Sequence, residues 1–213
     1  KGIIGTALAS VCAAVLVVSG CSENINELKE NARAKALSEP VMAAEETEEE
    51  GTEEESVSPE QMDLIKYNYY VELNNEIVKL MDDIDYYYEV VEYDEEFALI
   101  PDSGYTYGYR IRGFGKDLAD DCIQLADMEP AYETLDPLIK EMAEPLKELM
   151  AAFSEVSRSN DYAANQYQKA KELHAVIYPA ADEFEPMGYE FIHAVSAVAD
   201  ERIAAEEEEM KAE

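Results

Sequence analysis

Apolar residues recur at alternating steps of three and four through the first long periodic stretch of the chain. Its members are Met62, Ile65, Tyr69, Leu73, Ile77, Leu80, Ile84, Tyr87 and Val91. This spacing places every one of them on a single helix face. Ser58 is a good cap residue, Pro59 suits the first helical position, and Gln61 completes a capping box. The sequence therefore predicts a long amphipathic helix that begins next to Ser58.

The same period returns in the second half of the chain. It covers residues 118–125, 135–156 and 163–184, and then a last stretch that starts at about Pro186 and passes through Phe191, Val195, Val198 and Ile203. Pro145 and Pro179 fall inside these patterns and are expected to kink the helices. We predict an all-α fold, an elongated antiparallel bundle of three to five kinked helices. The last pattern ends without a capping glycine, so we expect this bundle to be incomplete at its C-terminal end.

Residues 94–116 lose the helical period. Proline and glycine interrupt the chain there at Pro101, Gly104, Gly108, Gly113 and Gly115, and side chains alternate through Tyr105, Tyr107, Tyr109 and Ile111. This alternation predicts a short extended piece or a hairpin. Connections of this length are often functional, so the segment is a candidate binding loop.

The N-terminus has the pattern of a bacterial lipoprotein signal. Lys1 precedes an apolar run from Ile3 to Val18, and the small residues Ser19 and Gly20 lead to Cys21. The run is short for a stable membrane span, which disfavours the alternatives of an uncleaved anchor or a buried helix. We expect cleavage between Gly20 and Cys21 and acylation, such as palmitate, on the Cys21 thiol.

An acidic segment separates this signal from the helices. Within residues 38–57, which contain no basic residue, eight glutamates crowd between positions 45 and 55, and such a block repels itself and stays extended. The predicted organisation is a signal peptide over residues 1–20, a lipidated tether over 21–57 and a helical domain over 58–213. A low-affinity cation buffer is the weaker interpretation of the glutamates, because an extended run lacks a fixed oxygen cage.

Net charge restricts the partners of the chain. With 16 basic and 49 acidic residues, the formal net charge is −33 at pH 7. That balance argues against binding nucleic acid and against docking onto anionic lipid. Membrane attachment is therefore expected only through acyl chains on Cys21. Cys122 would be the one thiol left in the mature protein, and we expect it to be a half-buried packing residue of a helix.

Two stretches resemble the YiiG-like bacterial lipoproteins, whose helical domain has no assigned function. The first is Tyr-Asn-Tyr-Tyr-Val-Glu-Leu-Asn-Asn at residues 67–75; the second runs from Tyr132 through Asn160-Asp161-Tyr162 to Lys-Ala-Lys-Glu-Leu-His at residues 169–174. The resemblance covers about residues 60–184. It implies an all-helical, lipid-anchored envelope domain without established activity, so no catalytic residue is carried over.

The chain offers little of the chemistry that catalysis or tight metal binding requires. Glu190 and His193 share one helix face, as in di-iron bundles, but such sites need a second Glu-His pair and two further glutamates. His174 lies on an apolar stripe and is expected to be a core residue. No nucleophile-base spacing is present, so we predict neither an enzyme nor a cofactor.

The predicted function is therefore a lipid-anchored, non-enzymatic binding module on the extracytoplasmic side of a membrane. The chain has fifteen tyrosines and no tryptophan, and Tyr105, Tyr107 and Tyr109 form the candidate contact surface for an envelope protein or a saccharide. Ordinary packing is the other interpretation of these tyrosines and the more common one, because the polar tip of the ring tolerates partial burial. The alternative is a metal or small-ligand binding protein. It would use Glu190 with His193, or the acidic residues between Asp82 and Asp85.

Overall fold

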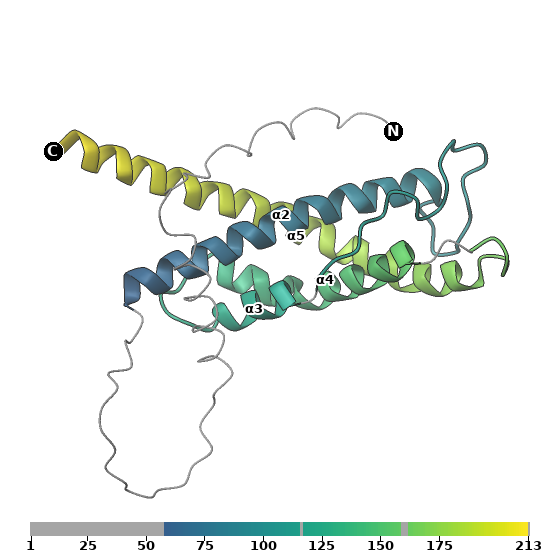
Figure 1. The fold of residues 1–213 in the computed structure, drawn as a ribbon, viewed down its shortest axis with the longest axis horizontal. Coiled ribbons are helices and arrows are strands. Elements are labelled where there is room, and N and C mark those ends of the chain that lie inside the picture. Colours follow the sequence, from purple (N-terminus) through teal and green to yellow (C-terminus); the bar gives the residue numbers. More distant parts are fainter. Residues whose placement is uncertain (1–57, 116, 159–161, 213) are drawn as a thin grey trace, which may run out of the picture.

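Four helices make up the part of the chain that the computed structural model describes, which is residues 58–115, 117–158 and 162–212 (Figure 1). They are α2 (Pro59–Val90), α3 (Asp117–Leu125), α4 (Leu135–Arg158) and α5 (Gln168–Ala212). No strand occurs among these residues, so the predicted all-α fold is confirmed. The predicted signal peptide, Cys21 and the acidic tether lie outside the described residues.

The start of α2 has the capping box that its sequence predicts. The Ser58 hydroxyl accepts the Gln61 backbone N–H at 3.2 Å, and the Ser58 N–H donates to the Gln61 side chain at 2.9 Å. These reciprocal bonds satisfy two backbone donors that a helix start leaves unpaired. The predicted apolar stripe is also confirmed, because Ile65 to Val91 of that stripe are buried and Met62 is half-buried.

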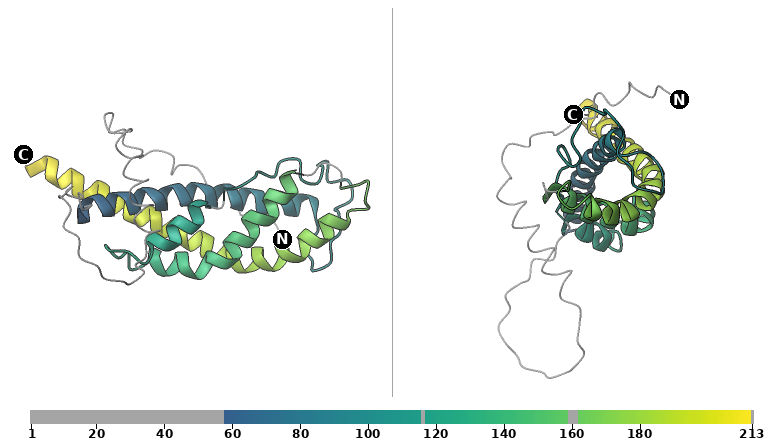
Figure 2. Two further views of the ribbon diagram at one scale, coloured as in Figure 1. Left: turned by 60° about the horizontal axis from the view of Figure 1, so that its bottom comes forward. Right: turned by 90° about the vertical axis from the view of Figure 1, so that its right-hand side faces the viewer.

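Consecutive helices run in opposite directions along one elongated bundle. Cys122 of α3 contacts Tyr69 near the start of α2, and Phe153 near the end of α4 lies beside Tyr87 near the end of α2. α5 then returns, because its residue Arg202 reaches Asp63 at the beginning of α2. Seen along the bundle, the helices surround a common core (Figure 2).

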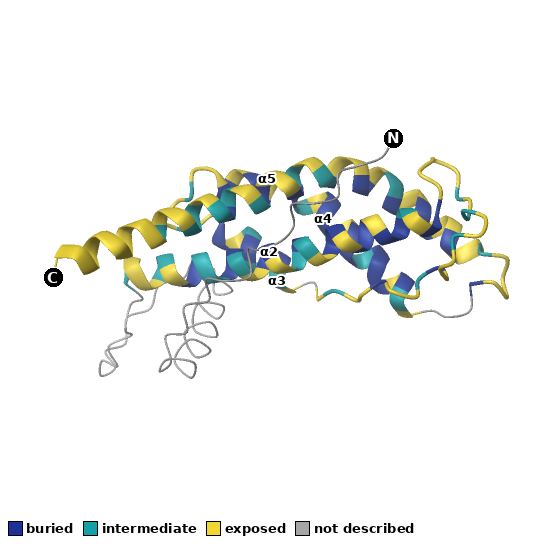
Figure 3. Ribbon diagram, turned by 90° about the horizontal axis from the view of Figure 1, so that it is seen from above, coloured by how far each residue is buried: buried dark blue, intermediate teal, exposed yellow. Residues whose placement is uncertain are grey.

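Buried residues lie on the inward faces of these helices (Figure 3), and the large side chains among them build the core. Fully buried members include Tyr70, Leu73, Ile77, Ile139, Phe153, Phe184 and Phe191. Each such side chain contributes about 1.5–3 kcal/mol to folding by leaving water. The last turns of α5 are exposed and project past the other helices (Figures 1 and 3).

α5 corrects the prediction of two separate C-terminal helices. The chain stays helical through Pro179 and Pro186, although a new helix was expected to start near Pro186. Both prolines are exposed, so water can reach the carbonyl groups that lose their hydrogen-bond donor. On the opposite face Phe184, Gly188 and Phe191 continue the buried stripe without a break. Packing of this stripe offsets the cost of the prolines.

In the connection between α2 and α3, residues 91–115, the stretch from Tyr105 to Arg110 forms turns and bends, so the short extended piece or hairpin predicted there is not found. The one bridge in this connection pairs Val91 with Leu99, and the remainder forms turns. Gly108 has a positive φ of +75°, and a Cβ there would lie 3.2 Å from Val156 of α4. Only glycine fits this close approach without strain. The loop therefore packs along α4 where the short α3 does not reach.

Within the described residues, none of the helices combines the length and the apolar character that crossing a bilayer requires.

Candidate functional site

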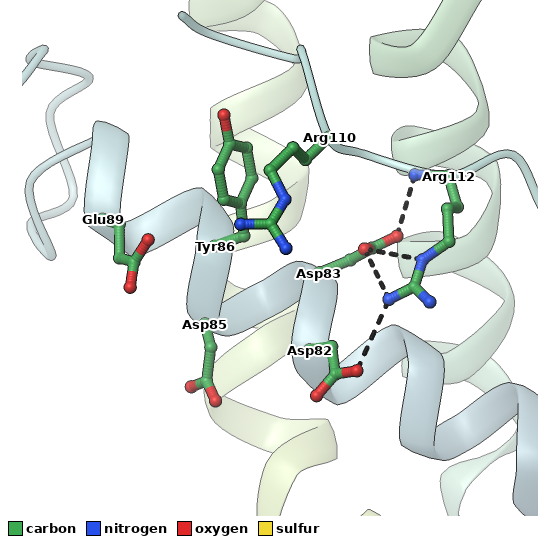
Figure 4. A pocket seen from close by; sticks show the side chains of 7 residues that line it. All are labelled: Asp82, Asp83, Asp85, Tyr86, Glu89, Arg110 and Arg112. Atoms are coloured by element: carbon green, nitrogen blue, oxygen red, sulfur yellow. Dashed lines mark hydrogen bonds and ion pairs between the residues drawn. The ribbon is translucent and has the colours of Figure 1, made fainter. Parts of the chain in front are cut away.

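A surface pocket of about 520 Å³ lies between α2 and the loop that follows it (Figure 4). Helix α2 supplies five lining residues and the loop supplies two. They are Asp82, Asp83, Asp85, Tyr86 and Glu89 from α2, and Arg110 and Arg112 from the loop. We call it the α2–loop pocket. It lies on the acidic stretch that the sequence had suggested as one alternative ligand site.

Arg112 fixes the loop to α2. Its backbone N–H donates to Asp83 Oδ2 at 2.9 Å, and its Nε and Nη2 donate to Asp83 Oδ1 at 3.1 and 3.0 Å. Nη2 also donates to the Lys79 carbonyl at 2.9 Å and lies 3.6 Å from Asp82. Burial raises the pKa of the Asp83 carboxyl, and the bonds from Arg112 oppose that effect. The Arg112 guanidinium group therefore holds the loop on α2 and has a structural role.

Arg110 is held differently. Its guanidinium carbon lies 5.3 Å from the centre of the Tyr86 ring, a cation–π contact. The Tyr86 hydroxyl donates to the Thr106 carbonyl at 3.3 Å, and its ring meets Tyr105 edge-on at 5.5 Å. Within the described chain, Arg110 has no carboxylate at ion-pair distance. It is an exposed cation without an anionic partner in the part of the chain that is described.

Negative charge accumulates along the same side of α2. Asp82, Asp85 and Glu89 are spaced three and four residues apart, which brings them onto one face. Burial, and then Asp82 and Glu89, raise the pKa of the Asp85 carboxyl. On α5, burial together with Asp85 and Asp182 raises the pKa of Glu185. These carboxylates repel one another across the α2–α5 surface.

The structure separates the three tyrosines of the predicted contact surface. Tyr105 and Tyr109 are 48% and 80% exposed, whereas Tyr107 is only 7% exposed. The Tyr107 ring packs edge-on against Tyr162 at 4.7 Å and against Phe97 at 5.7 Å. Tyr107 is thus a core residue, because the loop turns inward to cover the end of the bundle. Of the three tyrosines, only Tyr105 and Tyr109 are exposed; Tyr105 contacts the pocket residue Tyr86, and Tyr109 precedes the pocket residue Arg110 in the chain.

His174 and Cys122 are both buried. Burial of His174 agrees with the prediction, whereas Cys122 is more deeply buried than the half-buried position that we expected. His174 Nε2 lies 2.8 Å from the Asp94 carbonyl oxygen, and Nδ1 lies 2.8 Å from the Tyr87 hydroxyl. A carbonyl only accepts, so Nε2 carries the proton in this arrangement. Burial raises the pKa of the Cys122 thiol, which disfavours a reactive thiolate.

Glu190 and His193, the candidate metal ligands, are exposed on α5. Among the described residues, no group of three or more His, Cys, Asp or Glu side chains is arranged to hold a metal ion. A pair alone does not supply the coordination number that di-iron or zinc sites need.

A second polar cluster, which sequence reasoning missed, lies at the other end of the bundle. The Lys66 ammonium is completely buried and donates to Asp136 Oδ2, the Met128 carbonyl and the Pro130 carbonyl at 2.7–2.9 Å. The Tyr70 hydroxyl donates to the other Asp136 oxygen at 2.5 Å. Lys66 is next to the predicted apolar stripe, but nothing in the sequence identifies Asp136 as its partner. We call this group the Lys66 cluster.

A family model described as a protein of unknown function, DUF3829, matches residues 61–213. The chain belongs to this family. The matched range begins in the first turn of α2 and includes every residue of the α2–loop pocket and of the Lys66 cluster, so the DUF3829 domain is the helical bundle itself. No curated protein and no solved structure matches the chain.

Proposed function

We propose that this DUF3829 protein is a lipid-anchored, non-enzymatic binding module of the cell envelope. Its contact surface is the α2–loop pocket together with the exposed rings of Tyr105 and Tyr109. The observation that carries the proposal is the combination, on one surface, of an open pocket, an arginine without an anionic partner among the described residues, and two exposed tyrosines. Tyrosine rings offer a large contact area and lose little conformational entropy on binding.

The geometry of the described residues favours binding over catalysis. The one described cysteine is buried with a raised thiol pKa, and both nitrogens of His174 are engaged inside the core. Nucleophilic catalysis requires a nucleophile and a base within reach of each other and of substrate. The pocket instead presents carboxylates, two guanidinium groups and one phenol.

The proposed location rests on the sequence Val18-Ser19-Gly20-Cys21 and on the resemblance to YiiG-like lipoproteins. A cell that carries the full chain should incorporate a fatty-acid analogue into the protein, and the Cys21→Ser variant should not incorporate it. Fractionation should recover the wild-type chain with membranes and the variant elsewhere. Labelling of Cys21→Ser to the wild-type level would refute lipidation at this residue.

The binding role is tested by placing a photoreactive amino acid at Tyr109 in living cells. The same group at Met210, which is also exposed but lies near the end of α5, is the control. A discrete crosslinked product from position 109, absent from position 210 and lost on Tyr105→Ala, supports the proposed surface. Equal products from both positions, or none from position 109, would count against it.

A further inference from the structure

We infer that the α2–loop pocket binds a peptide that carries an ammonium group close to a carboxylate. In this arrangement Arg110 binds the carboxylate, and Asp85 and Glu89 bind the ammonium group. The inference rests on the proposed function and names the chemistry of the partner. It follows from which charged groups of the pocket are already paired inside the protein and which are not.

Arg112 and Asp83 are not available to a ligand. The Asp83 carboxylate is buried and accepts three donors from Arg112, and the Arg112 guanidinium group also bonds the Lys79 carbonyl. Displacing either group would release the loop from α2. The charges of Arg112 and Asp83 neutralise each other. The other charged residues that line the pocket therefore determine what binds.

The remaining charges have both signs. Arg110 is stacked on Tyr86, and Asp85 and Glu89 have no cation within ion-pair distance among the described residues. A purely anionic ligand would face the carboxylates of α2 and, beyond them, Asp182 and Glu185. A purely cationic ligand would leave Arg110 unpaired beside a second positive charge. A ligand with both signs matches the pocket, because electrostatic complementarity disfavours the other two.

The form of the pocket selects a peptide over a free amino acid. Its volume of about 520 Å³ exceeds what one amino acid fills, and its lining is open and polar. Exposed ion pairs are screened by water, so two of them alone do not offset the entropy lost on association. A chain of several residues can also lie on the exposed rings of Tyr105 and Tyr109, and that contact supplies the missing affinity.

The test measures binding of three short peptides to the full chain, purified in detergent, by ligand-detected nuclear magnetic resonance. The probe is N-acetyl-Gly-Lys-Gly-Ala with a free carboxylate. The second peptide is its C-terminal amide, which lacks the carboxylate. The third contains acetyl-lysine, which lacks the ammonium group. We expect the zwitterionic probe to bind about fivefold more tightly than either relative, the size of effect that one partly exposed ion pair produces.

Two variants assign the charges. Arg110→Gln should abolish the preference for the acid over the amide and keep the preference for lysine over acetyl-lysine. Glu89→Gln should abolish the preference for lysine over acetyl-lysine and keep the preference for the acid over the amide. The matched controls Lys211→Gln and Glu207→Gln change an exposed pair near the end of α5 and should alter neither preference.

The inference predicts that each variant loses one of the two preferences and keeps the other. Selective loss in the two variants supports it. Equal binding of acid and amide would make the pocket a cation site and overturn it. Absence of binding by all three peptides, with the Tyr109 crosslink intact, would overturn the inference alone; absence of both would remove the proposed function as well.

Discussion

The two ends of the bundle each pair an aspartate with a cation from a distant segment, but they differ in what is left over. In the Lys66 cluster, the ammonium group has three acceptors and no exposure, and Asp136 also accepts from Tyr70 and from the Tyr132 backbone N–H. In the α2–loop pocket, the Arg112 side chain is 45% exposed, and beside it Arg110, Asp85 and Glu89 stay open to solvent. In the Lys66 cluster every charge has its partners within the protein, whereas the α2–loop pocket keeps charged groups that no described residue pairs.

This difference separates charges that hold the fold together from charges that are free to bind a partner. A buried ion must have every donor and acceptor satisfied, because an unpaired charge inside a protein is strongly destabilising. The Lys66 cluster therefore has nothing to offer a partner. An exposed charge can remain unpaired at little cost, and the α2–loop pocket keeps three of them on one surface. Unused hydrogen-bonding and charge capacity is the better sign of a binding site.

The largest expected loss of stability comes from removing the buried ammonium group of Lys66. Lys66→Met leaves Asp136 buried without its counter-ion, and we expect a loss of about 3–5 kcal/mol in the free energy of unfolding. Urea denaturation of the full chain measures it. Lys79→Met is the control on the same helix, because Lys79 is half-exposed and should change stability by less than about 0.5 kcal/mol. Similar losses for the two variants would erase the contrast between the two ends.

A smaller loss is expected from the half-exposed cation. Arg112→Met leaves the Asp83 carboxylate with one backbone N–H, and we expect a loss of about 1–3 kcal/mol. The value is lower than for Lys66 because water reaches the Arg112 side chain. Arg158→Met, at an exposed i,i+3 pair in α4, should be nearly neutral in the same denaturation experiment. A loss above that of Lys66→Met would show that the loop anchor, not the buried pair, dominates stability.

The burial of acidic groups between α2 and α5, together with their mutual repulsion, should be visible in the pH dependence of stability. The pKa values of Asp85 and Glu185 are raised in the folded protein, so folding favours their protonated forms. Their contribution to stability is unfavourable at neutral pH and disappears as the pH falls below the ordinary carboxyl range of about 4. Asp85→Asn with Glu185→Gln should therefore stabilise by about 0.5 kcal/mol or less at pH 7 and by less at pH 4. An advantage that grows on acidification would contradict this sign.

The smallest effect on stability is expected at the exposed rings. Tyr109→Ser removes a side chain that is mostly in water and should change the unfolding free energy by less than about 0.5 kcal/mol, while it weakens binding at the proposed surface. Tyr107→Ser, two residues away in the loop, creates a cavity among Tyr87, Phe97 and Tyr162 and should cost several kcal/mol. Thermal unfolding of both variants distinguishes them, and equal stability would contradict the division of the loop into a buried and an exposed side.

Much of the helical framework was accessible from the sequence. The capping box at Ser58 and the stripe from Ile65 to Val91 were both predicted, because they depend on residues a few positions apart. The single helix α5 was not predicted, since a new helix was expected to start at Pro186, whereas Pro179 was expected only to kink the one before it. In the structure both prolines lie on the exposed side of α5, opposite its buried stripe, and neighbours distant in sequence decide which side that is.

Only part of the candidate site could be predicted from the sequence. The acidic run between Asp82 and Asp85 was noted, but its combination with Arg110 and Arg112 was not, because the loop lies more than twenty residues further along the chain. Alternation from Tyr105 to Tyr109 indicated a surface of three tyrosines. The positive φ at Gly108 belongs to a turn that buries Tyr107, and no alternating pattern reveals it.

The sequence by itself therefore determined the buried faces of the helices, the capped start of α2, the acidity of the chain and the irregular segment between α2 and α3. Local spacing and capping encode these properties. Tertiary structure alone decided that Lys66 meets Asp136, that Arg112 holds the loop on α2, and that Arg110 has no anionic partner among the described residues. Such pairings join residues that are far apart in the chain, and only the packed bundle fixes which charges are saturated.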